Sequence, residues 1–188
     1  MEGALRPPVK DRHEGRQRMD KLFAAIGKLS LALAAAAKVV LGLIIVAVVA
    51  DVCVRNLGLR PLAWAVSATE YGLLYAAFLP MPWLVHSKGH VFVEFLRKAL
   101  PVRARAVLEK LVYLACIGVC LYLGSVALSS LIGAVSGGEY ETRSFDMPKW
   151  LVFLPITLAF YLSALEWLRY LLGRDTLYTL DPLEMEGL

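Results

Sequence analysis

The stretch Thr69–Leu96, TEYGLLYAAFLPMPWLVHSKGHVFVEFL, predicts how this chain is organised. It begins inside an apolar segment that carries one acid, Glu70, and it leaves that segment through two closely spaced prolines. Proline lacks a backbone donor, so it kinks or ends a helix. The following run, Val91–Leu96, has too many apolar residues for an exposed loop and too many nearby charges for a membrane span. We therefore expect a membrane helix that ends near the bilayer surface, followed by an amphipathic helix at about residues 90–100 that lies in the interface.

The composition is that of a membrane protein. Apolar residues make up 59% of the 188 residues, charged residues 19%, and the mean hydropathy is +0.61, which is far above that of an ordinary soluble domain. A spanning helix needs about 20 mostly apolar residues. Four windows meet this need, at about residues 31–54, 62–85, 111–135 and 148–172. We expect an all-α integral membrane protein with a single four-helix membrane domain, residues 29–172.

The charge pattern predicts the orientation of the spans. Residues 1–28 form a basic segment, which we expect to be a cytoplasmic tail that is disordered to about Asp20, and residues 173–188 form a second short tail. Fifteen of the 20 Lys and Arg lie in these two tails, the end of the fourth window and the connection between the second and third windows, against four in the other two connections. Basic residues favour the cytoplasmic side, so both termini are expected there. The first apolar run is longer than the apolar core of a cleavable signal, so we expect it to be retained.

The four tryptophans fit the same arrangement. Trp64 and Trp83 lie near the ends of the second window, and Trp150 and Trp167 near the ends of the fourth. Along a helix these pairs are separated by about 28 Å and about 25 Å, close to the hydrocarbon thickness of about 30 Å. Because Trp favours the headgroup level, we predict that all four form interfacial belts.

Glu70 is the acid at the greatest predicted depth. An ionised acid there costs several kcal/mol unless it is paired or hydrated. Arg55 is the nearest partner across the first helical hairpin, and it also lies four residues after Asp51, on the same helix face. Glu70 could be a proton- or cation-coupling acid, or a structural clamp to another helix or a partner subunit. We favour the clamp, because a coupled ion site needs several converging groups.

The third window carries a pattern of small residues. Ser125, Ser129 and Gly133 repeat every four residues, and such a stripe allows close helix contact in a membrane. It is the candidate packing face of that helix.

The fourth window begins and bends at recognisable residues. Asp146 is expected to cap the helix, with Pro148 in its first turn, and Pro155 is expected to bend it. Glu166 and Arg169 are spaced i,i+3 at the other end and can pair there.

The sequence carries no motif for chemistry. It contains no phosphate-binding loop, dinucleotide fingerprint, zinc-protease motif or nucleophile elbow, so we expect no enzyme. His86 and His90 are spaced i,i+4, but the third histidine is His13 and no Cys or second carboxylate lies nearby at ligand spacing. We therefore expect no metal, haem or other cofactor in this chain. The basic residues are split among separate segments without interleaved aromatics, so no nucleic-acid partner is expected.

The order of these features resembles the small membrane subunit of tripartite ATP-independent periplasmic (TRAP) transporters, the DctQ-like family. The resemblance covers roughly residues 39–172. It rests on the basic N-terminal segment, four spans, Arg55, Glu70, the run Gly89-His90-Val-x-Val-Glu94, and Asp146-Met-Pro-x-Trp150 followed by Pro155. Where that family usually has a pair of acids in the second span, this chain has Thr69 before Glu70.

The resemblance implies a small permease subunit in a bacterial inner membrane. It would pack as a scaffold against a large many-span permease subunit, to which a periplasmic solute-binding protein delivers an organic acid for sodium-driven uptake. The sodium is expected to bind the large subunit. The candidate structural and partner-interface residues are Arg55, Glu70, Gly89, His90, Glu94, Ser125, Ser129, Gly133, Trp150 and Pro155.

Two other classes of function are compatible with the pattern. One is a small proton-coupled exporter that works as a homo-oligomer through Glu70. The other is the membrane anchor subunit of an oxidoreductase. A haem in such an anchor needs axial histidines on facing spans, and the third and fourth windows contain none.

Overall fold

The computed structural model describes residues 9–87, 101–142 and 146–173. The elements in chain order are α1 (Val9–Asn56), α2 (Ala63–Phe78), α3 (Met81–His86), α5 (Val102–Gly137), β1 (Tyr140–Thr142), β2 (Asp146–Pro148) and α6 (Trp150–Leu171). The predicted all-α class is confirmed, with one small β-hairpin added. The predicted interfacial helix at residues 90–100 lies outside the described residues.

Three of the described helices are long and apolar enough to cross a membrane. They are Met19–Asn56 within α1, Val107–Gly137 within α5, and α6. The second predicted window, residues 62–85, is divided into α2 and α3 at the prolines, as the sequence predicted. α2 has 16 residues, so it reaches about 24 Å, short of the roughly 30 Å of a hydrocarbon core.

The break between α2 and α3 lies at the prolines that the sequence singled out. α2 is capped by Leu79, and Pro80 is the N-cap of α3. Pro82 follows within the first turn of α3, where its missing donor leaves no helical bond unmade. The helix resumes at once, because the Leu84 N–H donates to the Pro80 carbonyl at 2.9 Å. α3 has six residues in all and ends at His86.

The first helix starts much earlier than expected. α1 begins at Val9 and runs for 48 residues, so the prediction of a disordered tail is wrong for residues 9–20. This segment is rich in Arg, Lys, Glu and Gln, which favour helix, and no proline interrupts the passage into the apolar run. A helix of this length extends about 72 Å, so its polar first turns continue beyond the bilayer core.

The connection before α6 is a β-hairpin, which the sequence analysis did not predict. β1 and β2 are antiparallel, with Thr142 opposite Asp146. Asp146 therefore does not cap α6, and the N-cap is Lys149. A residue before proline is driven to extended backbone, so Met147 continues a strand and the helix starts at Trp150.

An ion pair closes the hairpin at the start of α6. Lys149 Nζ donates to Glu139 Oε2 at 2.8 Å. This hydrogen bond, together with the charge of Glu139, raises the pKa of Lys149 above its ordinary value. Gly138 ends α5 with a positive φ of 57°, a left-handed conformation that glycine adopts without strain. The chain can therefore reverse direction sharply between α5 and β1.

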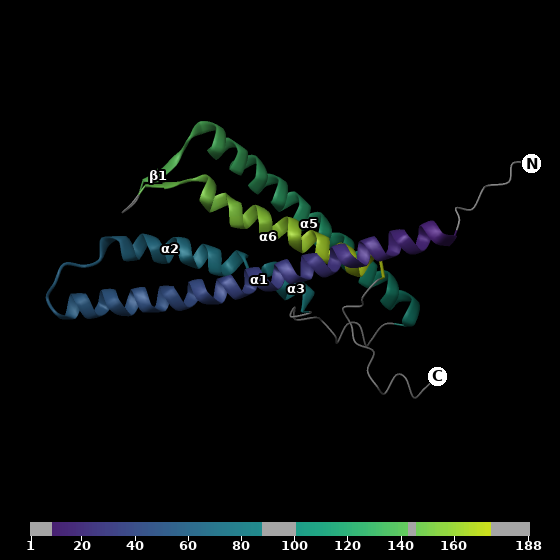
Figure 1. Ribbon diagram of the computed structural model, residues 1–188, viewed down its shortest axis with the longest axis horizontal. Coiled ribbons are helices and arrows are strands. Elements are labelled where there is room, and N and C mark those ends of the chain that lie inside the picture. Colours follow the sequence, from purple (N-terminus) through teal and green to yellow (C-terminus); the bar gives the residue numbers. More distant parts are fainter. Residues whose placement is uncertain (1–8, 88–100, 143–145, 174–188) are drawn as a thin grey trace, which may run out of the picture.

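The helices form two antiparallel hairpins, α1–α2 and α5–α6, which diverge toward one end of the molecule (Figure 1). At that end lie the α1–α2 turn and the β-hairpin. α5 and α6 pack more extensively than any other pair, and α3 packs on both α1 and α6. The short helix α3 thus joins the two hairpins at the end where they converge.

The core is small and is located at the convergent end. It is a cluster of buried side chains from α3, α5 and α6, comprising Val85, Tyr113, Cys120, Ala164, Trp167 and Tyr170. Trp167 is only 5% exposed, so the prediction of an interfacial belt is wrong for this residue. Its ring lies 6.0 Å from that of Tyr113 and 5.9 Å from that of Tyr170, because the C-terminal end of α6 packs against α5 at this position.

Elsewhere the helices expose large apolar side chains. Examples are Val46 on α1, Leu73 on α2 and Leu114 on α5, which are 67%, 51% and 62% exposed. Apolar exposure on this scale is rare on a soluble monomer. It is the surface expected of helices that face lipid or another membrane subunit.

Candidate functional site

A cluster of polar side chains lies where α1, α3 and α6 meet, and we call it the inner polar cluster. Its members are Ser30, His86, Glu166, Arg169 and Tyr170. Glu166 is 1% exposed and Ser30 is fully buried. A buried acid in an otherwise apolar helix is costly, because its charge is removed from water. Glu166 therefore requires partners that offset its desolvation.

Three charged or titratable groups form a triangle in this cluster. His86 Nδ1 lies 3.0 Å from Glu166 Oε2 and 2.9 Å from Arg169 Nη1. Arg169 Nη1 lies 3.6 Å from the same carboxylate oxygen. Guanidinium groups only donate and ionised carboxylates only accept. Nδ1 therefore either donates to Glu166 or accepts from Arg169, and the guanidinium charge balances the carboxylate in both cases.

Further contacts fix the His86 ring and the end of α3. The ring stacks on Trp83 at a centroid distance of 5.2 Å. The Tyr170 hydroxyl donates to the Val85 carbonyl at 2.8 Å and lies 3.2 Å from the His86 carbonyl. These carbonyls belong to the last turn of α3. Tyr170 thus holds the end of α3 against α6.

α1 joins the cluster through Ser30 and Gly27. Ser30 Oγ lies 3.5 Å from Glu166 Oε1, at the limit of a hydrogen bond. A Cβ at Gly27 would come within 2.7 Å of His86 Cε1. Only glycine therefore lets α1 approach the imidazole this closely.

The chemistry of the inner polar cluster is that of a clamp. Glu166 is held by one cation, one imidazole and one hydroxyl from three helices, and each of these groups is oriented by other contacts. Among the described residues, no group of three or more His, Cys, Asp and Glu side chains could hold a metal ion. His86 was weighed as a ligand in the sequence, and here its Nδ1 faces Glu166 and Arg169. The cluster joins the convergent ends of the two hairpins.

A second polar clamp lies at the opposite end of α1. Arg55 Nε donates to Asp51 Oδ2 at 2.7 Å, so Arg55 pairs within its own helix and not with Glu70. The Leu62 N–H donates to Asp51 Oδ1 at 2.8 Å. Asp51 is 8% exposed and ties α1 to the start of α2. The spacing of Asp51 and Arg55 predicted a shared face, but it did not predict the contact across the turn.

Glu70 is exposed on α2. Within this chain Glu70 is therefore not buried, whereas Glu166 is. The difference arises because α2 contacts α1 and α6 along only part of its surface.

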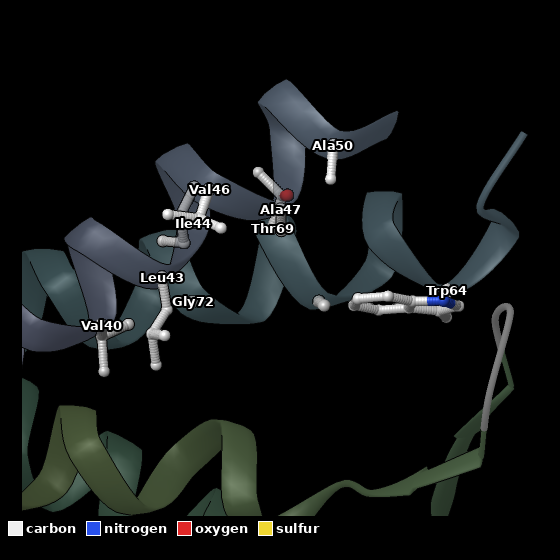
Figure 2. A pocket seen from close by; sticks show the side chains of 10 residues that line it. Val40, Leu43, Ile44, Val46, Ala47, Ala50, Trp64, Thr69 and Gly72 are labelled. Atoms are coloured by element: carbon white, nitrogen blue, oxygen red, sulfur yellow. The ribbon is translucent and has the colours of Figure 1, made fainter. Parts of the chain in front are cut away.

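An apolar groove of about 470 Å³ runs between α1 and α2, and its lining includes the residue that precedes Glu70. Figure 2 shows Trp64 at the end of this groove nearest the α1–α2 turn, with Ala47 and Gly72 along it. Thr69 also lines the groove, but its hydroxyl donates to the Ala65 carbonyl at 2.8 Å. The groove therefore offers apolar surface to a neighbour in the membrane.

The small-residue stripe on α5 does not face α6. Ser125, Ser129 and Gly133 are all exposed, and the two serine hydroxyls donate to carbonyls three residues earlier in α5. The face that packs on α6 includes Gly124, where a Cβ would lie 3.4 Å from Phe160 Cβ. Within this chain the stripe is thus left available, and its role as a partner interface stays a prediction.

The other predicted residues fall in different places. Trp150 is 37% exposed at the start of α6. Pro155 is fully buried and borders a small cavity with Leu33 and Tyr75. Gly89, His90 and Glu94 lie outside the described residues. The structure therefore does not gather the seven candidates that it describes into one site.

The sequence analysis missed most of the inner polar cluster. It predicted the contact between Glu166 and Arg169, which is confirmed, but not that His86, Ser30 and Tyr170 complete it. One signal was present, because Glu166 lies in the otherwise uncharged run LSALEW. The partners come from helices about 80 and about 136 residues away in the sequence, so their spacing carries no local pattern.

Comparison with known families gives a match over most of the membrane domain. The sequence model of the family described as "Tripartite ATP-independent periplasmic transporters, DctQ component" matches residues 44–176. This range begins in the last third of α1 and ends just after α6, and it covers well over half of the chain. No curated protein and no solved structure matches the chain.

Proposed function

This chain belongs to the DctQ family, the DctQ component of tripartite ATP-independent periplasmic transporters, and we propose that it acts as the scaffold of the large permease subunit in such a transporter. Membership makes it a multi-pass integral membrane protein and a transporter component, not an enzyme. The family match over residues 44–176 is the observation that carries the proposal. Neither a homo-oligomeric exporter nor an oxidoreductase anchor accounts for that match.

We further propose four membrane crossings, with both termini in the cytoplasm of a bacterial inner membrane. α2 and α3 together with their proline break span residues 63–86, which is about 36 Å along a helix and long enough to cross. Figure 1 supports an even number of crossings, because the start of α1 and the end of α6 lie toward the same end of the molecule. The excess of Lys and Arg near that end favours the cytoplasmic side.

The scaffold role is supported by the way the polar groups are used. The inner polar cluster satisfies Glu166 within this chain, so its polar side chains are occupied in holding helices together. The remaining surface, including the α1–α2 groove and the Ser125–Gly133 stripe, is apolar or small. Such surfaces suit helix packing in a membrane, where close contact supplies the attraction. The large subunit is the proposed neighbour.

The transport chemistry is assigned to the partners. We propose that the large subunit binds sodium and an organic acid, and that a periplasmic solute-binding protein delivers the acid. The family description supports such a division, because it names this component as one of a tripartite system. This chain would then contribute assembly and no cofactor.

Affinity purification tests the scaffold proposal. The tagged full-length chain is extracted in mild detergent, and its partners are identified by mass spectrometry. The expected result is a stoichiometric, very hydrophobic many-span protein. Uptake of candidate organic acids in cells should require both subunits and a sodium gradient. Recovery of this chain only as a homo-oligomer would contradict the proposal.

Substitution of Glu70 distinguishes the scaffold proposal from the hypothesis of a homo-oligomeric exporter. Glu70→Gln should leave transport proportional to the amount of assembled complex, because no coupling role is assigned to the acid. Full assembly with abolished transport would instead identify Glu70 as a coupling group. Glu139→Gln, at an exposed acid in the β-hairpin connection, is the matched control.

A further inference from the structure

A proline inside α6 deprives one backbone carbonyl of its usual helical partner. Pro155 has no N–H, and in a regular helix that N–H would bond the carbonyl four residues earlier, which belongs to Leu151. The proline ring also crowds this carbonyl and pushes it away from the helix. Within a membrane span, a carbonyl freed in this way has to find a donor in the surrounding protein. The Leu151 carbonyl therefore needs a partner from outside α6.

The partner comes from α2, in the other helical hairpin. The Tyr75 hydroxyl donates to the Leu151 carbonyl at 2.7 Å, which is a typical length for a good O–H···O hydrogen bond. The two residues are 76 positions apart in the sequence. A side chain of α2 thus replaces the helical hydrogen bond that Pro155 removes from α6.

This hydrogen bond joins the two hairpins at a distance from the inner polar cluster. Tyr75 lies 11 residues before His86, and Pro155 lies 11 residues before Glu166. Each interval corresponds to about 17 Å along a helix. The bond is therefore located well toward the divergent ends, beyond the clamp that fixes the convergent ends.

Pro155 divides α6 into two parts that are held differently. The longer part, which follows the proline, is anchored in the core through Ala164, Trp167 and Tyr170. The shorter part is the first turn, residues 150–154, and it leads directly from the β-hairpin. Thr157 weakens the helix at the division, because its hydroxyl donates to the Phe153 carbonyl at 2.9 Å, a contact that bends helices.

The packing around the division leaves room for movement. A cavity of about 50 Å³ borders Tyr75 and Pro155, and apolar side chains such as Leu33, Leu79 and Leu158 form its other walls. Voids larger than a water molecule are few in a protein interior. The first turn of α6 can therefore shift here without forcing neighbouring side chains into one another.

We propose that Tyr75 and Pro155 form a latched hinge in α6, which sets the separation of the two hairpins at their divergent ends (Figure 1). While the Tyr75 hydroxyl is bonded to Leu151, the first turn of α6 and the β-hairpin are held at one distance from α2. When this bond breaks, α6 bends at Pro155 and the divergent ends move apart, while the inner polar cluster stays intact. A few residues that absorb a change in backbone angles are the usual form of a hinge. A membrane neighbour that binds the separated arrangement better shifts the population toward it.

A double-mutant cycle tests whether the hydroxyl replaces the missing donor. Tyr75→Phe should lower the apparent melting temperature of the full-length chain in detergent by about 2–6 °C, the effect of losing one hydrogen bond in a chain of this length. Pro155→Ala restores the N–H, so Tyr75→Phe should have a much smaller effect in that background. Tyr122→Phe is the matched control, because Tyr122 is 69% exposed on α5, and it should leave the melting temperature unchanged.

Distances between spin labels test the movement itself and do not require Pro155→Ala. The three native cysteines are replaced, and labels are attached at Val66→Cys, exposed on α2, and at Asp146→Cys, exposed in β2. Pulsed electron–electron double resonance on the full-length chain in lipid nanodiscs measures their separation. We expect a narrow distance distribution when Tyr75 is present, and a longer and broader one in Tyr75→Phe. Tyr122→Phe in the same labelled chain should reproduce the narrow distribution.

Three outcomes would overturn the latched hinge. A loss of stability in Tyr75→Phe no larger than that in Tyr122→Phe would show that the hydroxyl contributes nothing. Equal losses from Tyr75→Phe in the Pro155 and Pro155→Ala backgrounds would make the bond an ordinary contact and not a replacement for the missing donor. Identical distance distributions with and without Tyr75→Phe would show that the bond does not hold the divergent ends, and this measurement decides if Pro155→Ala does not fold.

Discussion

At the scale of single residues, the position of Glu166 explains most of the polar chemistry in the chain. It lies in an apolar helix, yet it contacts His86, Arg169 and Ser30 from three helices. Removing one partner of a buried ion pair is more damaging than removing an exposed one, because the remaining charge stays desolvated. The inner polar cluster should therefore be sensitive to single substitutions.

Glu166→Ala should strongly destabilise the protein. Arg169 would lose its buried counter-charge, at a cost of about 3 kcal/mol, which corresponds to a fall of roughly 6–12 °C in the apparent melting temperature in detergent. Glu139→Ala removes an acid from an exposed ion pair and should cause little change, since such pairs contribute little. Similar melting temperatures for the two variants would mean that Glu166 is not a clamp.

Gly27 offers a second test at the same scale. Gly27→Ala would place a methyl group 2.7 Å from His86 Cε1, and the ring is held by Trp83 and Glu166. Overpacking of this kind costs about 1–3 kcal/mol, so the apparent melting temperature should fall.

Gly42→Ala is the matched control for Gly27→Ala. Gly42 lies in the same helix, and a Cβ there would meet nothing within 4 Å. Alanine favours helix over glycine by about 1 kcal/mol, so this variant should be neutral or slightly more stable. The difference in sign between the two substitutions is the expected result, measured by thermal unfolding in detergent.

At the scale of elements, α5 has two distinct faces. One face packs on α6 through Tyr113, Cys120 and Gly124. The other presents Ser125, Ser129 and Gly133 to the surroundings. The two faces predict different consequences for large side chains.

Gly124→Leu should disrupt the α5–α6 pair, because a Cβ at Gly124 already contacts Phe160 and Tyr161. We expect a loss of about 1–3 kcal/mol in stability and a lower yield of folded chain. Gly133→Leu should leave the isolated chain folded, since a Cβ there would meet nothing within 4 Å. It should instead reduce recovery of the large subunit in affinity purification, if the stripe is the proposed interface.

Gly118→Leu controls for added bulk on α5. Gly118 is exposed and a Cβ there would also meet nothing within 4 Å, and it lies on the same face of α5, about two turns before the stripe. Undiminished partner recovery in Gly133→Leu would remove the stripe from the interface, whereas reduced recovery in both variants would extend the interface along this face.

At the scale of the whole molecule, the two helical hairpins converge at the inner polar cluster and diverge toward the β-hairpin (Figure 1). The cluster of buried aromatic side chains lies at the convergent end. The divergent ends are connected by few contacts, among them the hydrogen bond from Tyr75 to the Leu151 carbonyl at 2.7 Å. The apolar surfaces that this arrangement leaves exposed are available to a partner in the membrane.

Labelling of single cysteines tests the number of crossings. The native Cys53, Cys116 and Cys120 are first replaced, and Leu59→Cys, in the exposed α1–α2 turn, and Asp146→Cys, in β2, are compared in intact and permeabilised spheroplasts. With four crossings, both positions should react with an impermeant maleimide from the same outer side.

Gln17→Cys supplies the reference for the opposite side. Gln17 is exposed near the start of α1 and should react only after permeabilisation. If α2 and α3 do not cross, Leu59→Cys and Asp146→Cys will be labelled from opposite sides. That result would mean that the chain crosses the membrane three times and not four.

Several properties of this protein follow from its sequence alone. Length and apolarity predict α1, α5 and α6, because a spanning segment must satisfy its backbone internally and so forms a helix. Pro80 and Pro82 predict the break in the second window, since proline removes a donor wherever it occurs. The order of Arg55, Glu70 and the later motifs indicates the family that the comparison then shows. Each of these properties is local or additive along the chain.

Tertiary structure decided which polar residues are buried and which helix faces remain exposed. The sequence directed attention to Glu70, whereas the packing buries Glu166. The sequence suggested an ion pair between Arg55 and Glu70, whereas in the folded chain Arg55 pairs with Asp51. Trp167 has the residue type and the helix-end position of an interfacial belt residue, but it is buried in the core. These outcomes depend on which distant helices come together. In a uniformly apolar sequence almost every helix face could pack against another helix, so only the folded arrangement decides which faces are buried.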